Sequence, residues 1–140
     1  MSAWAFARLS LVFLWLATAL VSVSSGRELG YQVLAGGGIE GRLADLCLYG
    51  GAALDLILGI WLLSGRAMLA CLRIQGVVVL VYSLLLSLID PSFWAHPFGP
   101  LTKNVPILAL ILLLHQRQRQ GEEIPVAATA ATNPPGSDRR

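Results

Sequence analysis

Four apolar segments, separated by short polar connections, constrain this chain more than any other feature. They cover residues 9–25, 43–63, 67–89 and about 98–114. A helix needs about 20 apolar residues to cross the hydrocarbon core of a bilayer, with roughly 17 as the lower limit. We therefore predict an all-α membrane protein, a four-transmembrane-helix bundle that occupies residues 1–115.

The composition favours the same class and argues against a nucleic-acid-binding protein. Of the 140 residues, 56% are hydrophobic and 13% are charged, far from the average of a soluble globular chain. The net charge of +2 is small and the basic residues are scattered, whereas binding to phosphates needs clustered Lys and Arg. We expect the lipid bilayer as a partner and no nucleic acid.

The second and third segments are the clearest spans. They meet at LSGR, residues 63–66, a pattern typical of a tight turn between two antiparallel helices. The fourth segment is shorter, because its uninterrupted apolar part covers only residues 105–114. It reaches spanning length only if Lys103 and Asn104 lie at or inside the membrane interface.

The first segment has two readings. In MSAWAFARLSLVFLWLATALVSVSSG, a lone Arg8, an apolar core and small residues at Ser22 and Ser24 are typical of a cleavable signal sequence. Trp4 and Trp15, together with Arg8, instead suit a retained helix that is anchored at the interface. We favour retention, with cleavage as the alternative.

Basic residues gather on one side of the four-span arrangement. That side holds Arg8, Arg66, Arg73, Arg117, Arg119, Arg139 and Arg140. The other side holds Arg27, Arg42 and Lys103. The positive-inside rule then places both termini in the cytoplasm. Residues 116–140 lack bulky apolar side chains and are rich in Ala, Thr and Pro, so we predict a disordered cytoplasmic tail.

A glycine-rich outer loop is predicted between the first and second spans. Gly36, Gly38 and Gly41 in LGYQVLAGGGIEGRLADL match the G-x-G-x-x-G spacing of dinucleotide-binding turns. That fingerprint needs a strand before the turn and a parallel sheet behind the following helix, and here the following helix is a membrane span. We interpret the glycines as letting the chain bend at the outer membrane surface, where Tyr31 could anchor it.

Polar residues inside the spans are the main candidates for function, because such groups usually face the bundle interior and neutralise one another. Asp55 and Arg73 both lie roughly 13 Å from the turn at helical rise, so we predict a buried polar pair of Asp55 with Arg73 or Gln75. Gly51, Asp55 and Gly59 recur every four residues and form a small face that a neighbouring helix can approach closely. The pair either locks the hairpin, which we favour, or marks a proton or substrate path.

No catalytic or metal-binding constellation stands out in the sequence. His96 and His115 fall on opposite sides of the membrane and cannot share a metal. Cys47 and Cys71 differ in depth by roughly 15 Å, which is too far for a disulfide. We predict no catalytic activity of the chain on its own, no metal and no covalently bound cofactor, which leaves room for a quinone because a quinone needs no covalent ligand.

The connection before the last segment carries a family resemblance. The stretch FWAHPFGPLTKNVPILA, with LYGGAALDLILGIWLL and RLSLVFLWLATALVS earlier in the chain, resembles the DoxX-like family of small bacterial membrane proteins across about residues 8–114. The most specific positions form an outer-face family motif: His96, Pro97, Phe98, Gly99, Pro100, Lys103 and Asn104. The family supplies no agreed catalytic residues, so these positions carry no assigned role.

The resemblance implies a four-helix protein of the bacterial inner membrane. Founding members of the family are small subunits of a thiosulfate:quinone oxidoreductase, and some relatives are fused behind an NAD(P)-binding short-chain reductase domain. By analogy, the chain would be a non-catalytic accessory or anchoring subunit for a quinone-linked or NAD(P)-dependent redox partner, alone or as a homo-oligomer. The alternatives are a small proton-coupled transporter or channel that uses Asp55, and a purely structural membrane protein.

Overall fold

The chain folds into helices throughout the computed structural model, which describes residues 2–95 and 101–131. The elements are α1 (Ala3–Val23), α2 (Arg27–Gly36), α3 (Gly41–Ser64), α4 (Met68–Ile89), the short 3-10 helix η1 (Pro91–Trp94) and α5 (Asn104–Ala131). No strand occurs in this part of the chain, which confirms the all-α prediction. The family-motif positions His96, Pro97, Phe98, Gly99 and Pro100 lie outside the described residues.

Three helices, α1, α3 and α4, are long and apolar enough to cross a membrane. They coincide with the first three predicted segments, which are thereby confirmed as apolar helices of spanning length. α1 begins earlier than predicted, at Ala3, because Ser2 caps it: the Ser2 hydroxyl accepts a hydrogen bond from the amide of Ala5 at 3.2 Å. Serine is among the residues preferred at this position.

The last helix begins later than predicted. α5 starts at Asn104 instead of near residue 98, and residues 101–103 before it form a turn. Pro106 lies in the first turn of α5, where the missing proline amide removes no bond within the helix. Because its apolar part is short, α5 is not among the described helices that could span by length and composition alone.

The same helix also ends later than predicted. α5 continues to Ala131, so residues 116–131 are helical where we predicted disorder. That prediction rested on the lack of apolar residues, which limits packing against a core but not local backbone conformation. The Gln, Arg and Glu residues that follow His115 favour a helix locally.

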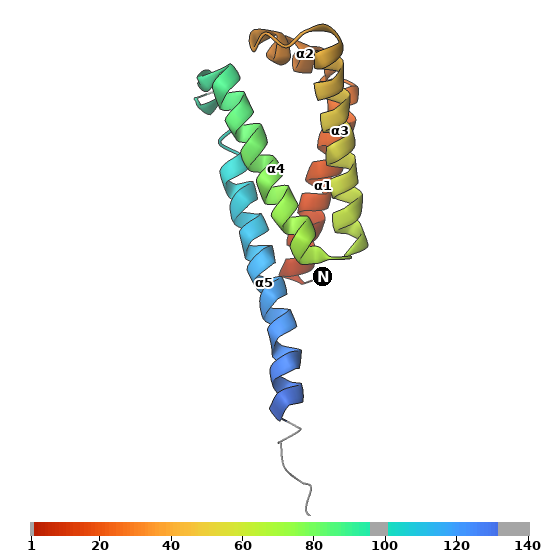
Figure 1. Cartoon of the computed structure of the whole chain (residues 1–140), viewed down its shortest axis with the longest axis vertical. Coiled ribbons are helices and arrows are strands. Elements are labelled where there is room, and N and C mark those ends of the chain that lie inside the picture. The colour runs from red at the N-terminus through yellow and green to blue at the C-terminus, as the bar shows by residue number, and fades with distance from the viewer. Residues whose placement is uncertain (1, 96–100, 132–140) are drawn as a thin grey trace, which may run out of the picture.

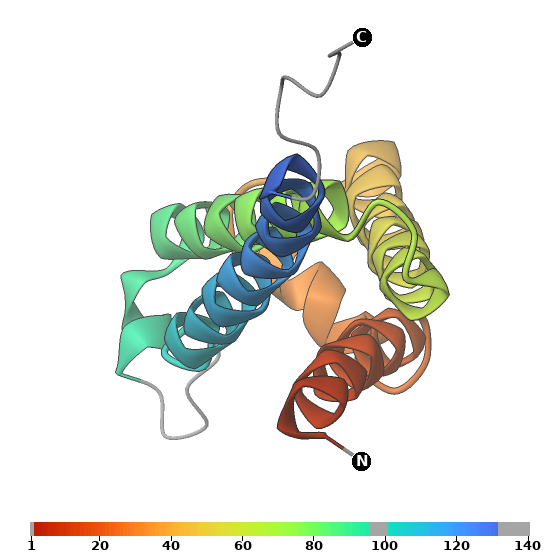
Figure 2. The ribbon, with the colours of Figure 1, turned by 90° about the horizontal axis from the view of Figure 1, so that it is seen from below.

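The helices pack as two antiparallel pairs. α1 lies along α3 and α4 lies along α5, while the contacts between the pairs are less extensive. Seen from below, α1 and α3 lie on one side of the molecule and α4 and α5 on the other (Figure 2). α3 and α4 meet at the bottom of the molecule and diverge toward the top (Figure 1).

The turn between α3 and α4 lies where LSGR predicts it. α3 ends at Ser64, and Gly65 follows with a φ of +71°, a left-handed conformation that glycine adopts without strain. The indole N–H of Trp61 closes the turn by donating to the carbonyl of Arg66 at 2.8 Å. This tight connection makes α3 and α4 a hairpin.

Arg8 of α1 holds the end of α3. Its Nε donates to the carbonyl of Leu62 at 3.1 Å, and its Nη2 donates to the carbonyl of Leu63 at 2.8 Å. The last carbonyls of a helix have no partner within the helix, and a cation is favourable beside them. The half-buried guanidinium therefore stabilises the α1–α3 pair at this end.

The predicted glycine-rich loop is, in large part, the short helix α2. A glycine turn ends this helix: the amide of Ile39 donates to the carbonyl of Leu34, and that of Gly38, with a φ of +74°, donates to Ala35, both at 2.9 Å. This is the Schellman arrangement, in which a left-handed glycine closes a helix. The prediction of a glycine-rich loop was wrong for residues 27–36, because this stretch is helical and the glycines that follow it end the helix.

α2 lies across the end of the molecule opposite the α3–α4 turn (Figure 1). A β-carbon at Gly30 would come within 2.5 Å of Leu48 in α3, and one at Gly37 within 2.8 Å of Ile89 in α4. α2 therefore contacts both helix pairs at this end, which we call the α2 end. The opposite end, the arginine-rich end, holds Arg8, Arg66, Arg73, Arg117 and Arg119.

α1 and α3 approach each other closely at Gly59. A β-carbon there would lie 2.7 Å from Cδ2 of Leu16 and 3.3 Å from Cβ of Trp15. Lipid tails are as apolar as leucine side chains, so helices in a bilayer are held by close packing and polar bonds, not by apolar burial. The small residue at position 59 is therefore a main source of α1–α3 stability.

We expect Gly59→Val to lower the free energy of unfolding in detergent by about 1–3 kcal/mol, because the added carbons must displace Leu16 and Trp15. Gly50→Val is the matched control, since a β-carbon at Gly50 meets no atom within 4 Å. Thermal unfolding followed by circular dichroism would measure both variants. Equal effects at the two positions would contradict close packing at Gly59.

A candidate site between the helix pairs

A fully buried hydrogen bond connects the two helix pairs near the middle of α1. The indole N–H of Trp15 in α1 donates to Oε1 of Gln75 in α4 at 2.9 Å. Trp15 is 4% exposed and Gln75 is 0% exposed. The amide of Gln75 also donates from Nε2 to Sγ of Cys71 at 3.1 Å, so both ends of its amide have partners. A buried indole N–H usually finds such an acceptor.

The predicted role of Trp15 as an interface anchor is therefore wrong. An anchoring ring lies at the headgroup level with its apolar body in the bilayer, whereas this ring packs between helices. Its position twelve residues after the start of α1 places it roughly 18 Å along the helix. The polar N–H is satisfied by protein and not by the interface.

A second bond connects the pairs at Asp55. The hydroxyl of Tyr82 in α4 donates to Oδ1 of Asp55 in α3 at 3.3 Å. Asp55 is 3% exposed, and Tyr82 is half-buried. A β-carbon at Gly51, one turn from Asp55, would lie 3.5 Å from the Tyr82 hydroxyl, so the small face of α3 leaves room for the tyrosine ring.

The predicted bond from Asp55 to Arg73 or Gln75 is not formed, and Gln75 is bonded to Trp15 and Cys71 instead. The exposed Arg73 donates from Nε to Nε2 of His115 in α5, at 3.2 Å. At 100° per residue around the axis of α4, the side chain of Arg73 points about 160° away from that of Gln75, whereas the side chain of Tyr82 points within about 20° of it. Asp55 and Arg73 therefore lie at similar distances from the turn without facing each other. The seven-residue spacing of Gln75 and Tyr82 places Tyr82 on the inward face of α4 and could have identified it as the partner of Asp55.

We call Trp15, Asp55, Gln75 and Tyr82 the central polar cluster. It draws one residue from α1, one from α3 and two from α4, and both of its interhelical bonds run between the helix pairs. Its groups are a carboxyl, a phenol, a carboxamide and an indole, and the indole of Trp15 belongs to the buried apolar core that also contains Leu58, Leu72 and Val79. Such a cluster can bind a polar group of an otherwise apolar molecule, or bind a proton.

Polar contacts also fasten the start of α5 to α4. The side-chain amide of Asn104 donates to the hydroxyl of Ser83 at 2.8 Å, and the indole N–H of Trp94 donates to Ser87 at 2.9 Å. Each serine hydroxyl in turn donates to the backbone carbonyl four residues earlier, at 2.7 Å. Of the family-motif positions described, Asn104 therefore contacts α4, while the side chain of Lys103 is exposed.

The α2 end carries two further acidic residues with local partners. The hydroxyl of Tyr31 in α2 donates to Oδ1 of Asp45 in α3 at 2.7 Å. This hydrogen bond raises the pKa of Tyr31 from 10.0 to about 12. Asp90, just after α4, accepts a hydrogen bond from the amide of Ser92 at 2.9 Å. The side chain of Ser92 and, to a lesser extent, this amide lower the pKa of the Asp90 carboxyl.

The cysteines lie apart and in different surroundings, Cys47 exposed and Cys71 buried. In the described part of the chain, no three His, Cys, Asp or Glu side chains come close enough together to hold a metal ion.

Comparison with known proteins gives one match. A family model described as the DoxX-like family matches residues 12–112, which run from α1 into α5 and include the whole central polar cluster. No curated protein and no solved structure matches the chain.

The Trp15–Gln75 bond can be tested by a double-mutant cycle. We expect Trp15→Phe and Gln75→Leu each to lower the free energy of unfolding, with a coupling energy of about 0.6–1.7 kcal/mol between them. Chemical unfolding in mixed micelles would measure all four proteins. The pair Trp15→Phe with Gln116→Leu is the control, since Gln116 is exposed on α5 and should show no coupling with Trp15.

The Tyr31–Asp45 bond predicts a pH dependence at the alkaline end. Because the pKa of Tyr31 in the folded protein is above its unfolded value, its stabilisation is fully present below pH 10 and is lost as the pH rises through about 12. NMR titration with ¹³Cζ-labelled tyrosine, assigned with Tyr31→Phe, should find this phenol titrating near pH 12. In Asp45→Asn the same resonance should titrate at a lower pH, and an unchanged midpoint would contradict the assigned cause.

Proposed function

The chain belongs to the DoxX-like family, and we propose that it is a four-span inner-membrane protein that serves as an accessory or anchoring subunit for a redox partner. The partner is quinone-linked or NAD(P)-dependent and carries its own redox cofactor. The observation that supports this proposal most directly is the Asp55–Tyr82 hydrogen bond in the central polar cluster. The match to the DoxX-like family adds to this support.

We propose that α5 is the fourth span although its apolar run is short. Residues 105–114 cover only about 15 Å at helical rise, half of a hydrocarbon core of about 30 Å. The polar residues that flank this run are hydrogen-bonded to α4, Asn104 to Ser83 at one end and His115 to Arg73 at the other. Side chains with partners of this kind can lie within the membrane boundary at a lower cost than unpaired ones.

Four spans in alternating directions place both termini at the arginine-rich end. Arg8, Arg66, Arg73, Arg117 and Arg119 lie there, and Arg27 and Arg42 lie at the α2 end. The positive-inside rule supports a cytoplasmic position for the arginine-rich end. A soluble redox partner would then meet the protein at that end, and a second copy of the chain is an alternative neighbour within the membrane.

The central polar cluster offers hydrogen-bonding groups of the kind that a quinone head group uses. When bound, a quinone supplies the capacity to accept electrons, which the partner's cofactor would deliver. In this chain the second N–H of the Gln75 amide can donate a hydrogen bond to a carbonyl oxygen, since Cys71 accepts only one. The single O–H of Tyr82 is donated to Asp55, so it becomes available to a ligand carbonyl when the Asp55 carboxyl takes up a proton. The surrounding leucine and valine side chains suit the apolar remainder of such a molecule.

A second candidate function, proton-coupled transport through Asp55, is favoured by one finding. The carboxyl of Asp55 is bonded to a neutral phenol, not to the guanidinium of Arg73. A guanidinium would hold the carboxyl in its charged form, whereas a neutral partner allows it to bind and release a proton. Buried carboxyls in membrane proteins often lie on proton or substrate paths.

The accessory-subunit proposal predicts that the tagged full-length protein, purified gently from its own membranes, carries an extractable quinone or a redox protein in near-stoichiometric amount. Asp55→Asn and Tyr82→Phe should each lower the quinone content roughly tenfold, because the first replaces the ionisable carboxyl with an amide and the second removes the hydroxyl. Quinone would be measured by mass spectrometry of the lipid extract. Asp45→Asn, an exposed position at the α2 end, is the control.

Different experimental results would contradict the accessory-subunit proposal and the transport proposal. A bare homo-oligomer with neither quinone nor partner would overturn the accessory-subunit proposal. A proton flux into proteoliposomes that Asp55→Asn abolishes, with helicity retained, would then support transport. Loss of stability alone in Asp55→Asn, with no effect on ligand or flux, would leave the cluster a structural element.

A further inference from the structure

At the arginine-rich end, a hydrogen-bonded pair of side chains, Arg73 and His115, connects α4 and α5. Nε of Arg73 donates to Nε2 of His115 at 3.2 Å, so the imidazole nitrogen accepts and fixes the direction of the guanidinium. Among the described residues, Nε is the only nitrogen of Arg73 with a protein acceptor. The side chain is exposed, so its two terminal amino groups can bind an outside acceptor.

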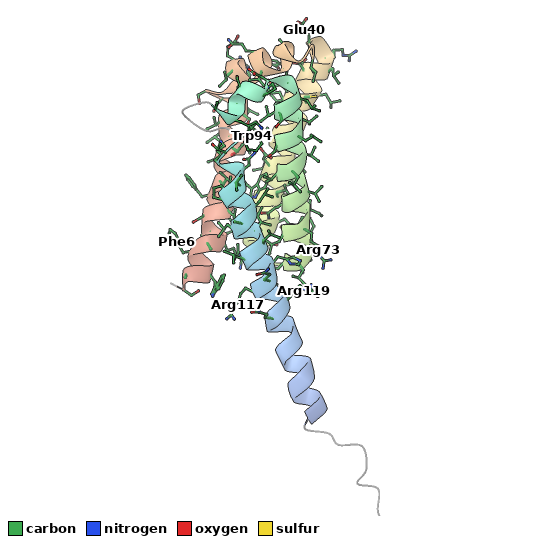
Figure 3. The ribbon with its side chains drawn as sticks, turned by 90° about the vertical axis from the view of Figure 1, so that its left-hand side faces the viewer. Phe6, Glu40, Arg73, Trp94, Arg117 and Arg119 are labelled. Atoms are coloured by element: carbon green, nitrogen blue, oxygen red, sulfur yellow. The ribbon has the colours of Figure 1, made fainter. Side chains whose placement is uncertain are left out.

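Arg119 lies on the same face. It follows His115 by four residues, one helical turn, so both side chains leave α5 in nearly the same direction. Arg117 points the other way, and its guanidinium lies 5.8 Å from the centre of the Trp4 ring of α1. Figure 3 shows this division, with Arg73 and Arg119 on one side of α5 and Arg117 on the other.

These residues lie near the ends of the apolar segments of α4 and α5. On α5 the apolar run ends at Leu114 and His115 follows at once. On α4, Arg73 lies roughly 7.5 Å from the first residue of the helix. Exposed apolar side chains lie directly beside this group toward the membrane interior, Val77 on α4, 59% exposed, and Leu112 on α5, 60% exposed.

We infer that Arg73, His115 and Arg119 bind the phosphate of an anionic phospholipid whose acyl chain lies along Val77 and Leu112. Arg73 and Arg119 supply positive charge and several N–H donors to the phosphate oxygens. His115 holds Arg73 in position. The apolar surface beside the cations distinguishes a lipid from a free phosphate ion, because only a lipid can use both.

Native mass spectrometry of the full-length protein in a neutral detergent tests this site. Phosphatidylglycerol, phosphatidylcholine and inorganic phosphate would be titrated separately and the dissociation constants measured. The variant Arg73→Gln/Arg119→Gln is compared with Arg27→Gln/Arg42→Gln, which removes the same charge from exposed residues at the α2 end. We expect the first variant to bind phosphatidylglycerol roughly 30-fold more weakly than the wild type, and the control to bind it within about threefold.

Three results would overturn the proposal: equal binding of phosphatidylglycerol and phosphatidylcholine by the wild type, equal losses in the two double variants, or binding of inorganic phosphate as tight as that of the lipid. If Arg73→Gln disturbs the fold, as judged by helicity, Arg119→Gln alone serves as the test, with an expected loss of roughly fivefold. No change in that single variant would also overturn the proposal.

Discussion

The hydrogen bond between the indole of Trp15 and the amide of Gln75 is the interaction on which the arrangement of the two helix pairs depends. Within a bilayer, moving an apolar side chain from lipid to protein yields little free energy, so helix association relies on close packing and on polar bonds between helices. α1 packs on α3, and α4 on α5, over long surfaces, but the surface between the pairs is smaller. The Trp15–Gln75 and Asp55–Tyr82 bonds therefore set how the pairs face each other.

Each end of the molecule adds its own connection to these central bonds. At the arginine-rich end, Arg8 binds the terminal carbonyls of α3, and Gly65 turns the chain directly into α4. At the α2 end, the short helix α2 touches both pairs, and glycines at its contact points allow the close approach. The pairs diverge toward the α2 end, so the central polar cluster lies between a tightly joined end and a more open one (Figure 1).

The central polar cluster and the cationic group of Arg73, His115 and Arg119 differ in their chemistry and in their surroundings. The cluster consists of neutral hydrogen-bonding groups and one carboxyl within the membrane, where a polar group without a partner is expensive. A ligand, a proton or a fixed helix geometry would each account for such groups in the interior. The cationic group lies near the ends of the apolar segments, and it suits a lipid phosphate because phosphates attract positive charge.

The amino-acid pattern was enough to predict the all-α class, the positions of three apolar helices, the turn at LSGR and the concentration of arginines at one end. These follow from hydropathy, helix length and glycine chemistry, which are local properties of the chain. The packing of the helices was needed to show that Asp55 is bonded to Tyr82, that Arg73 is bonded to His115, and that Trp15 lies in the interior. Depth along a helix can be counted from a turn, but the face that a residue presents to a neighbour depends on how the helices cross and rotate. That rotation results from packing across the whole bundle, as the close contact at Gly59 illustrates.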